Sequence, residues 1–355
     1  MEIQPFELER WFARHEADAD VMLAESGVRS LPAARFDLDA GDLGYVIPTD
    51  GDPALRERVA ARYDRDAGAV AFTCGTQEAN FLVFASLLGP DSHTVTVTPT
   101  YQSLHAVPDA FGSVTQVPLD DPDWTLDVEA VREAVTPETD LLVVNNPNNP
   151  TGRYHDPAVM DDLAAVAADN DAYLLVDEVY RLLAEDPDPP AAARYDHAIS
   201  TSGLSKAWGL AGLRFGWVAG PAEVVQAARQ WKDYTTISPP AVSQHVARQA
   251  FDREADILGE NRDLVARNRA LVAEFLDRHG LEWSDPVGVN AFVTVPDGFA
   301  GGRSFCERVV TEESVVLAPG EAFDQPDYFR LGFGLPTAEL EDALDRLDGF
   351  LARHA

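Results

Sequence analysis

Short apolar runs rich in β-branched residues alternate with longer amphipathic stretches between residues 70 and 220. This alternation predicts an α/β fold in which a largely parallel sheet is covered by helices on both faces. Ligands of such open sheets bind outside the carboxyl ends of the strands, so polar residues there are candidate site residues. The seven predicted strands are 70–73, 94–98, 114–118, 141–144, 173–176, 198–201 and 215–219. The predicted helices between them are 76–88, 101–112, 127–135, 157–169 and 208–213.

The pattern changes after about residue 222. Helical patterns followed by short strand patterns predict a second, smaller α+β domain, and a chain of 355 residues is long enough for two cores. We expect residues 40–250 to form a large domain, and residues 1–39 together with 251–355 to form the small one. The helical patterns cover 222–232, 240–279 and 337–353, and the strand patterns lie near 291–295, 315–317 and 329–332.

The chain carries a formal net charge of −33, from 60 acidic and 27 basic residues. This charge repels nucleic-acid phosphates and anionic lipid headgroups, so neither nucleic acid nor a membrane is an expected partner. The composition resembles that of proteins from salt-in halophiles such as haloarchaea, where concentrated salt screens self-repulsion. The alternative is an acidic mesophilic enzyme. In that case arginine-favouring codon usage would explain why Lys206 and Lys232 are the only lysines.

Features that the sequence lacks narrow the location and the chemistry. No stretch approaches the roughly 18–20 apolar residues of a membrane helix, and the N-terminus has no basic-then-apolar signal pattern. We therefore expect a cytoplasmic protein. Cys74 and Cys306 are too few for a disulfide framework and lack metal-ligand spacing, and the histidines form no HxxxH or HxH pair. We therefore expect no metal site.

The segment TSGLSKAWGLAGLRFGW (201–217) contains Lys206 at the end of a predicted strand and Arg214 after a glycine-rich turn. A lysine acts as a nucleophile when its pKa falls or when it is already held as an imine, and a nearby arginine favours the first and can also bind a phosphate. A surface lysine beside a structural arginine is the alternative. Retention of Lys206 in a chain with so few lysines argues against that. Ser205 approximates a GxSxG elbow, but Ala207 replaces its last glycine, which disfavours a serine hydrolase.

Two further motifs lie at the ends of predicted strands. The first is LLVVNNPNNPTGR (141–153), and the second is YLLVDEVYR (173–181). Taken singly, the first could be an Asn-Pro turn and the second a helix cap. Together with the lysine segment, and in this order at strand ends, they point to one site.

The series NNPTG…DEVY…SGLSKAWGLAGLRFGW resembles the class I/II aminotransferases of the fold-type I pyridoxal-phosphate superfamily. The spacings of 28 residues from Asn149 to Asp177 and of 29 residues from Asp177 to Lys206 also match. The resemblance runs from about residue 25 to the C-terminus. It implies pyridoxal 5'-phosphate as cofactor and transfer of an amino group between an amino acid and a 2-oxo acid.

The resemblance also implies residue roles. Lys206 carries the cofactor as an imine and later acts as the base. Asp177 pairs with the pyridine nitrogen and keeps the ring an electron sink. Tyr180 and Asn149 bond the 3′-oxygen of the ring, and Arg214 binds the phosphate.

The resemblance implies further cofactor contacts by residues upstream of these motifs. Tyr101 stacks on the ring. Gly75, Thr76 and Gln77 offer backbone N–H groups and a hydroxyl to the phosphate at a helix start. Many relatives have a serine or threonine three residues before the lysine. Gly203 stands there in this chain, so we expect Ser202 or Ser205 to substitute.

Two residues extend the site beyond the cofactor. Tyr45 matches a tyrosine that reaches the phosphate of the neighbouring subunit, which implies a homodimer with shared active sites. Arg330, in YFRLGFG, matches the arginine that binds the substrate α-carboxylate, next to Asn149.

Other functions stay open at this point. A pyridoxal-phosphate lyase, decarboxylase or cyclising synthase on the same fold is the nearest alternative. A cofactor-sensing transcription regulator is disfavoured, because the N-terminus leaves no room for a basic DNA-binding module. A nicotinamide dehydrogenase is disfavoured too, because no GxGxxG motif follows the first strand. The substrate is undetermined, because AESGVRSL (24–31) lacks the GENP-like stretch of many relatives. Arg29 or Arg35 could supply the second cation that a dicarboxylate needs.

Overall fold

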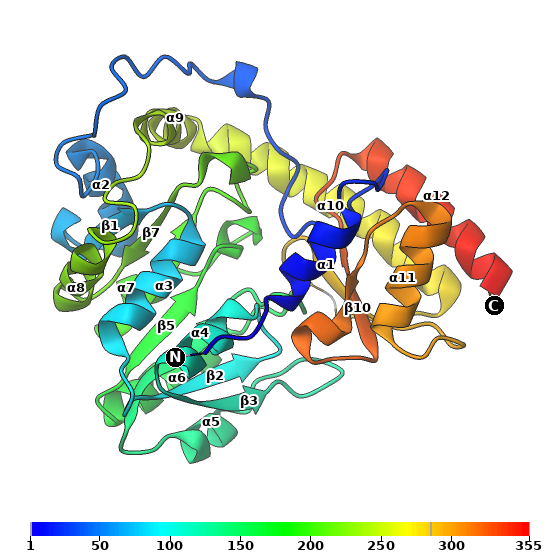
Figure 1. Cartoon of the computed structure of the whole chain (residues 1–355), viewed down its shortest axis with the longest axis horizontal. Helices are drawn as coiled ribbons and strands as arrows, with labels where there is room; N and C mark the ends of the chain where they lie inside the picture. The colour runs from blue at the N-terminus through cyan, green and yellow to red at the C-terminus, as the bar shows by residue number, and fades with distance from the viewer. Residues whose placement is uncertain (1, 285, 355) are drawn as a thin grey trace.

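Two β-sheets organise the chain in the computed structural model, which describes residues 2–284 and 286–354 (Figure 1). The large sheet has the order β1-β7-β6-β5-β4-β2-β3. β7 is antiparallel to both neighbours, and the other pairings are parallel. The predicted seven-stranded, mostly parallel sheet is confirmed. Its strands are β1 (Val70–Thr73), β2 (His93–Thr98), β3 (Ser113–Pro118), β4 (Thr139–Asn145), β5 (Tyr173–Asp177), β6 (Ala198–Gly203) and β7 (Gly216–Ala219).

Helices cover both faces of the large sheet, which is why its central strands are apolar at successive positions. In β4, Leu141 and Val143 pack into a core with α3, α4 and α8, whereas Leu142 and Val144 pack into the core that includes α2, α6 and α9. The edge strand β3 alternates polar and apolar residues and is largely accessible. The helices that flank the sheet are α2 (Pro53–Ala60), α3 (Thr76–Leu87), α4 (Ser103–Phe111), α5 (Val128–Ala134), α6 (Pro157–Asp169), α7 (Ala191–Arg194), α8 (Ala222–Lys232) and α9 (Ala241–Asp252).

The second sheet is antiparallel, with the order β8-β10-β9. Figure 1 shows it at the opposite end of the molecule from the large sheet, with the long helix α10 running between the two. The N-terminal segment joins this part of the chain, since Trp11 Nε1 donates to Leu317 O at 2.8 Å and Val21 forms a parallel bridge with Val315. The elements are α1 (Glu7–His15), α10 (Glu254–His279), β8 (Asn290–Thr294), α11 (Gly302–Glu313), β9 (Ala318–Pro319), β10 (Tyr328–Gly332) and α12 (Thr337–His354).

Several predicted elements differ from the structure. The helix predicted at 208–213 is wrong: a single 3-10 turn, Ala211–Leu213, occurs there, because the chain must turn back so that β7 can pair with β6. The predicted helix 240–279 is two helices that meet at Arg253. The strand expected at 315–317 lies at Ala318–Pro319. The pattern did not reveal α1, α2 or α11, whose apolar faces are short.

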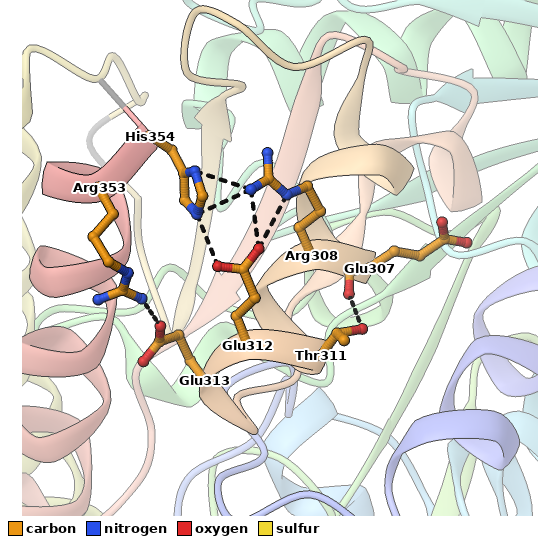
Figure 2. Close-up of polar contacts among 7 residues, drawn as sticks. All are labelled: Glu307, Arg308, Thr311, Glu312, Glu313, Arg353 and His354. Carbon is orange, nitrogen blue, oxygen red and sulfur yellow. Dashed lines mark hydrogen bonds and ion pairs between the residues drawn. The ribbon is translucent and has the colours of Figure 1, made fainter.

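A polar cluster joins the end of α12 to α11 (Figure 2). Glu312 accepts hydrogen bonds from Arg308 at 3.0 Å and from His354 at 2.8 Å, and Arg353 pairs with Glu313. Exposed pairs of this kind each contribute little to stability in ordinary buffers. They nevertheless show how arginine offsets part of the acidic surface.

The described residues contain neither a helix long and apolar enough to cross a membrane nor a group of three or more His, Cys, Asp or Glu side chains that could hold a metal ion. Cys74 and Cys306 are both free.

Candidate active site

A cavity of about 340 Å³ lies where β4, β5 and β6 end. Because these strands are parallel neighbours, the polar residues that follow each of them meet at one edge of the sheet. Nine residues singled out from the sequence line this cavity: Thr76, Gln77, Tyr101, Asn149, Asp177, Tyr180, Ser205, Lys206 and Arg214.

Lys206 and Asp177 face the same cavity. Asp177 is the last residue of β5, paired in register with Thr201 of β6, and Lys206 follows β6 by three residues. Lys206 Nζ donates a hydrogen bond to Ser26 Oγ at 2.8 Å, so the N-terminal segment contacts the amine directly. The other lysine, Lys232, is fully buried elsewhere and donates to Thr49 O at 3.1 Å.

Asn80 holds the Asp177 carboxylate and was missed from the sequence. Its Nδ2 donates to Asp177 Oδ2 at 2.8 Å, and its Oδ1 accepts from Thr201 Oγ1 at 2.6 Å. The N–H of Val179 donates to the other carboxylate oxygen at 3.1 Å. Burial raises the pKa of Asp177, and the bonds from Asn80 and Val179 and the charge of Lys206 oppose that rise. A buried asparagine in the first turns of α3 carries no distinctive spacing, so nothing in the sequence alone marked it.

The start of α3 forms an anion cradle at one side of the cavity. Gly75, at φ +88°, precedes the first turn and provides no side-chain cap, so the first N–H groups of α3 remain open. A Cβ at Gly75 would overlap the Arg214 guanidinium, which explains the need for glycine. Thr76 is 8% exposed, and its Oγ1 has no hydrogen-bond partner among the described residues. These groups suit a phosphate.

Ser205 is the serine that faces this cradle. It lines the cavity, and its Oγ accepts from Arg214 Nη1 at 3.4 Å. Ser202 is buried within β6 and does not line the cavity. A Cβ at Gly203 would lie 2.7 Å from Thr76 Oγ1 and 2.8 Å from Phe215 O, so a side chain there is sterically excluded. The hydroxyl-bearing residues that line the cavity near Arg214 are therefore Thr76 and Ser205, and not Ser202.

Asn149 lines the cavity, and Arg330 lies behind it, in contact with Asn149 but not itself among the lining residues. Arg330, in β10, is fully buried and donates to Asn149 Oδ1 at 2.8 Å and to Ala24 O at 2.7 Å. Its Nε has no partner among the described residues. Burial lowers the pKa of Arg330. A bound substrate carboxylate would compensate the charge of this buried cation.

Helix α1 lies over the cavity. Leu8, Glu9 and Phe12 contribute to the lining, and Tyr101 donates from its hydroxyl to Glu9 Oε1 at 3.1 Å. The Tyr101 ring also packs on Phe6 with 4.9 Å between ring centroids. The sequence assigned the N-terminal residues to the small domain and did not place them at the site.

Tyr45 is not part of this cavity. Its side chain is 66% exposed and lines a separate surface hollow with Leu43 and residues 238–242. Within a single chain, Tyr45 therefore does not meet the other predicted site residues.

The family model described as aminotransferase class I and II matches residues 20–347. The chain belongs to this family. It is 31% identical over 334 residues to the aspartate/prephenate aminotransferase of Thermus thermophilus, which covers 90% of this chain and 86% of that protein. It is 35% identical over 317 residues to the capreomycidine synthase of Streptomyces vinaceus, covering 87% and 81%. A crystal structure of a PLP-dependent aminotransferase from Streptococcus suis matches with a TM-score of 0.94 at 30% identity, covering 100% of this chain and 99% of that one.

This aminotransferase is an enzyme that uses pyridoxal 5'-phosphate, as the sequence motifs predicted. The residues present fit that cofactor on independent grounds. The cradle at Gly75 and Thr76 has an unpartnered buried hydroxyl and open N–H groups for a phosphate, and the same cavity contains one lysine and one buried carboxylate. The cavity volume of about 340 Å³ lies in the range of small-molecule sites.

Replacing Asn80 by leucine in the aminotransferase should lower kcat/KM about tenfold to a hundredfold, since a hydrogen bond to a charged group is worth roughly 1.5–3 kcal/mol. The carboxylate form of Asp177 loses its donor, so the pKa of Asp177 rises further. Ionised Asp177 is then lost at a higher pH than in the wild type. The acid limb of the kcat/KM–pH profile should accordingly move to higher pH. Asn170→Ala, which removes a bond to Val166 O only, is the control. An unshifted acid limb would contradict the role of Asn80.

Proposed function

We propose that this aminotransferase uses Lys206 both to attach its cofactor and to move the proton of the substrate Cα. The observation that carries the proposal is that Lys206 and Asp177 line one cavity with an anion cradle between α3 and Arg214. When bound, pyridoxal phosphate supplies an electron sink that stabilises negative charge at Cα. Asp177 would keep the ring nitrogen protonated, and Tyr180 and Asn149 would donate hydrogen bonds to the ring oxygen.

The remaining residues of the site bind the cofactor phosphate and orient the substrate. The residues that would hold the phosphate are Gly75, Thr76, Gln77, Ser205 and Arg214, and Tyr101 would pack against the ring. Arg330 takes the α-carboxylate of the amino acid or 2-oxo acid, with Asn149 fixing the guanidinium by the 2.8 Å bond. When Arg330 holds the carboxylate, the bond that breaks at Cα is the Cα–H bond and not the bond to the carboxylate carbon. The proton of that bond passes to Lys206. That orientation favours transamination over decarboxylation.

A second candidate is a synthase on the same fold, supported by the 35% identity to a protein named capreomycidine synthase. The two functions differ in their products. An aminotransferase converts its cofactor stoichiometrically to the amine form when given an amino donor without an acceptor. A lyase or synthase returns the cofactor to its starting form and releases a modified product.

We further propose that residues 40–250 form the cofactor-binding domain, and that residues 1–39 and 251–355 form the small domain. The bonds of Trp11 and Val21 to the segment before β9 support the second grouping. We also propose a cytoplasmic location, which agrees with two free cysteines.

A homodimer with shared active sites is proposed on the exposure of apolar residues. Leu43, Tyr45, Ile47 and Tyr234 are between 66% and 87% exposed, and Leu43 and Tyr45 line one hollow with residues 238–242. Exposed apolar patches of this kind are typical of protein–protein interfaces. A second copy would cover the patch, and its Tyr45 would complete the phosphate site.

Lys206→Ala should abolish amino-group transfer and the visible absorbance of the lysine-bound cofactor, while far-ultraviolet circular dichroism stays unchanged. The reason is that the change removes the only lysine that lines the cavity in the described chain. Lys232→Met is the matched control and should keep the absorbance. Persistence of the band in Lys206→Ala would instead assign the cofactor to Lys232.

Mixing Lys206→Ala and Tyr45→Ala subunits after partial unfolding should restore activity, measured at limiting cofactor concentration. In the hybrid dimer, one site combines an intact Lys206 with an intact Tyr45 from the other subunit, so one site of two is complete. Sedimentation should give the mass of a dimer. A monomer at working concentration, or no recovery in the mixture, would contradict the shared site.

The charge of −33 supports adaptation to concentrated salt, as in proteins of haloarchaea. Raising KCl from about 0.1 M to about 1 M shortens the screening length from roughly 10 Å to 3 Å. The melting temperature should therefore rise by several degrees as self-repulsion weakens. Sucrose, which does not screen charge, is the control. A melting temperature equally high at low salt would favour an acidic mesophilic enzyme.

A further inference from the structure

The N-terminal stretch Ala24–Ser26 passes between the two residues that would bind the reacting end of a substrate. Ala24 O accepts from Arg330 at 2.7 Å, and Ser26 Oγ accepts from Lys206 at 2.8 Å. Glu25 lies between them and lines the cavity. Its backbone lies directly against β10, since a Cβ at Gly332 would lie 1.9 Å from Glu25 O. A substrate that spans Arg330 and Lys206 therefore passes beside the Glu25 carboxylate.

Helix α1 and the residue that follows it, Glu16, add two more carboxylates to the same cavity. Glu9 and Glu16 are separated by two helical turns, with Phe12 between them on the same face, and all three line the cavity. The helix is anchored at its start by Gln102, whose Oε1 accepts from Glu7 N at 2.8 Å and whose Nε2 donates to Pro5 O at 2.9 Å. The carboxylates are therefore presented over the cavity by a fixed element.

Each cation at the site already has an expected partner in the cofactor or in the substrate α-carboxylate. Arg214 and Lys206 face the cofactor, and Arg330 faces the α-carboxylate. Arg29 and Arg35, the residues considered from the sequence for a second substrate carboxylate, do not line the cavity. Arg29 donates to Asn261 Oδ1 at 2.7 Å, and Arg35 pairs with Glu260 at 2.6 Å. Among the described lining residues, the charged groups without an assigned role are Glu9, Glu16 and Glu25, of which Glu9 also accepts a hydrogen bond from Tyr101 at 3.1 Å.

We propose that the enzyme prefers an amino acid whose side chain ends in a cation, either a guanidinium or an ammonium, received by Glu9, Glu16 and Glu25. The inference rests on the proposed function, since it assumes that Arg330 and Lys206 bind the reacting end. The buried, unpartnered Thr76 hydroxyl marks the phosphate side of the same cavity as a ligand site. A planar guanidinium can share its donors between carboxylates, and an aspartate or glutamate side chain would be repelled. The selecting residues belong to α1 and to the segment 24–31, where the sequence departs from the GENP-like pattern.

The deciding experiment compares arginine with citrulline, its neutral isostere, as amino donors to the holoenzyme, with ornithine, lysine and glutamate as further donors. Arginine should exceed citrulline in kcat/KM by about tenfold or more, as expected for hydrogen bonds between charged groups. Calorimetry should show the same preference in binding to the holoenzyme. Strong ornithine turnover with weak arginine turnover would assign the ammonium rather than the guanidinium.

Glu25→Gln and Glu16→Gln should raise the KM for arginine more than the KM for citrulline, because they remove charge and preserve shape. Glu7→Gln in α1 is the control, since Glu7 pairs with Arg303 and does not line the cavity. If the carboxylates contact the substrate directly, the preference for arginine over citrulline should persist at high salt. If only the overall negative potential attracts the substrate, high salt should abolish that preference, because it shortens the screening length.

Equal turnover of arginine and citrulline, or faster turnover of glutamate than of arginine, would overturn the proposal while the lysine-bound absorbance confirms the cofactor. Absence of that absorbance in the wild type would instead overturn the proposed function itself. A variant that fails to fold leaves the wild-type comparison of donors decisive.

Discussion

The placement of Lys206 opposite Asp177 is the constraint on which the rest of the site depends. It follows from the parallel pairing of β5 with β6, which brings Asp177 beside Thr201 and leaves Lys206 one short loop away. A buried carboxylate is costly unless hydrogen bonds compensate, and Asn80, Val179 and Lys206 supply that compensation. Asn80 in turn is fixed by Thr201, so the two strands and α3 form one connected network around the carboxylate.

The anion cradle depends on close approach of backbone to side chain. Gly75 allows the Arg214 guanidinium to lie against the start of α3, and Gly203 leaves room for the Thr76 hydroxyl. Arg214 itself adopts a left-handed conformation, at φ +48°, at the turn before β7. A non-glycine residue at positive φ costs free energy, and such residues concentrate at functional sites. The antiparallel return of β7 thus determines where the arginine lies.

The N-terminal segment connects the two halves of the chain at the site. Trp11 attaches α1 to the segment before β9, while Glu9 and Ser26 contact Tyr101 and Lys206 in the large half. Any movement of this segment would alter the accessibility of the cavity and the surroundings of the lysine together. Glu9, Glu16 and Glu25 of this segment line the cavity, so part of the high negative charge of the chain is concentrated at the site.

The sequence by itself determined the strand-helix alternation, because the spacing of apolar residues distinguishes strands from helices. It also identified the polar residues that follow β4, β5 and β6 as site candidates, because parallel strands end at the same edge of a sheet. It also determined the lysine, since only two exist in the chain. Only the tertiary structure decided that Asn80 supports Asp177, that Gly203 must lack a side chain, and that Glu9, Glu16 and Glu25 face the cavity. Those relations join segments far apart in the chain, such as Asn80 and Thr201 at a separation of 121 residues, through contacts that no local periodicity encodes. The helix expected at 208–213 failed for the same reason, because pairing of β7 outweighed local helical preference.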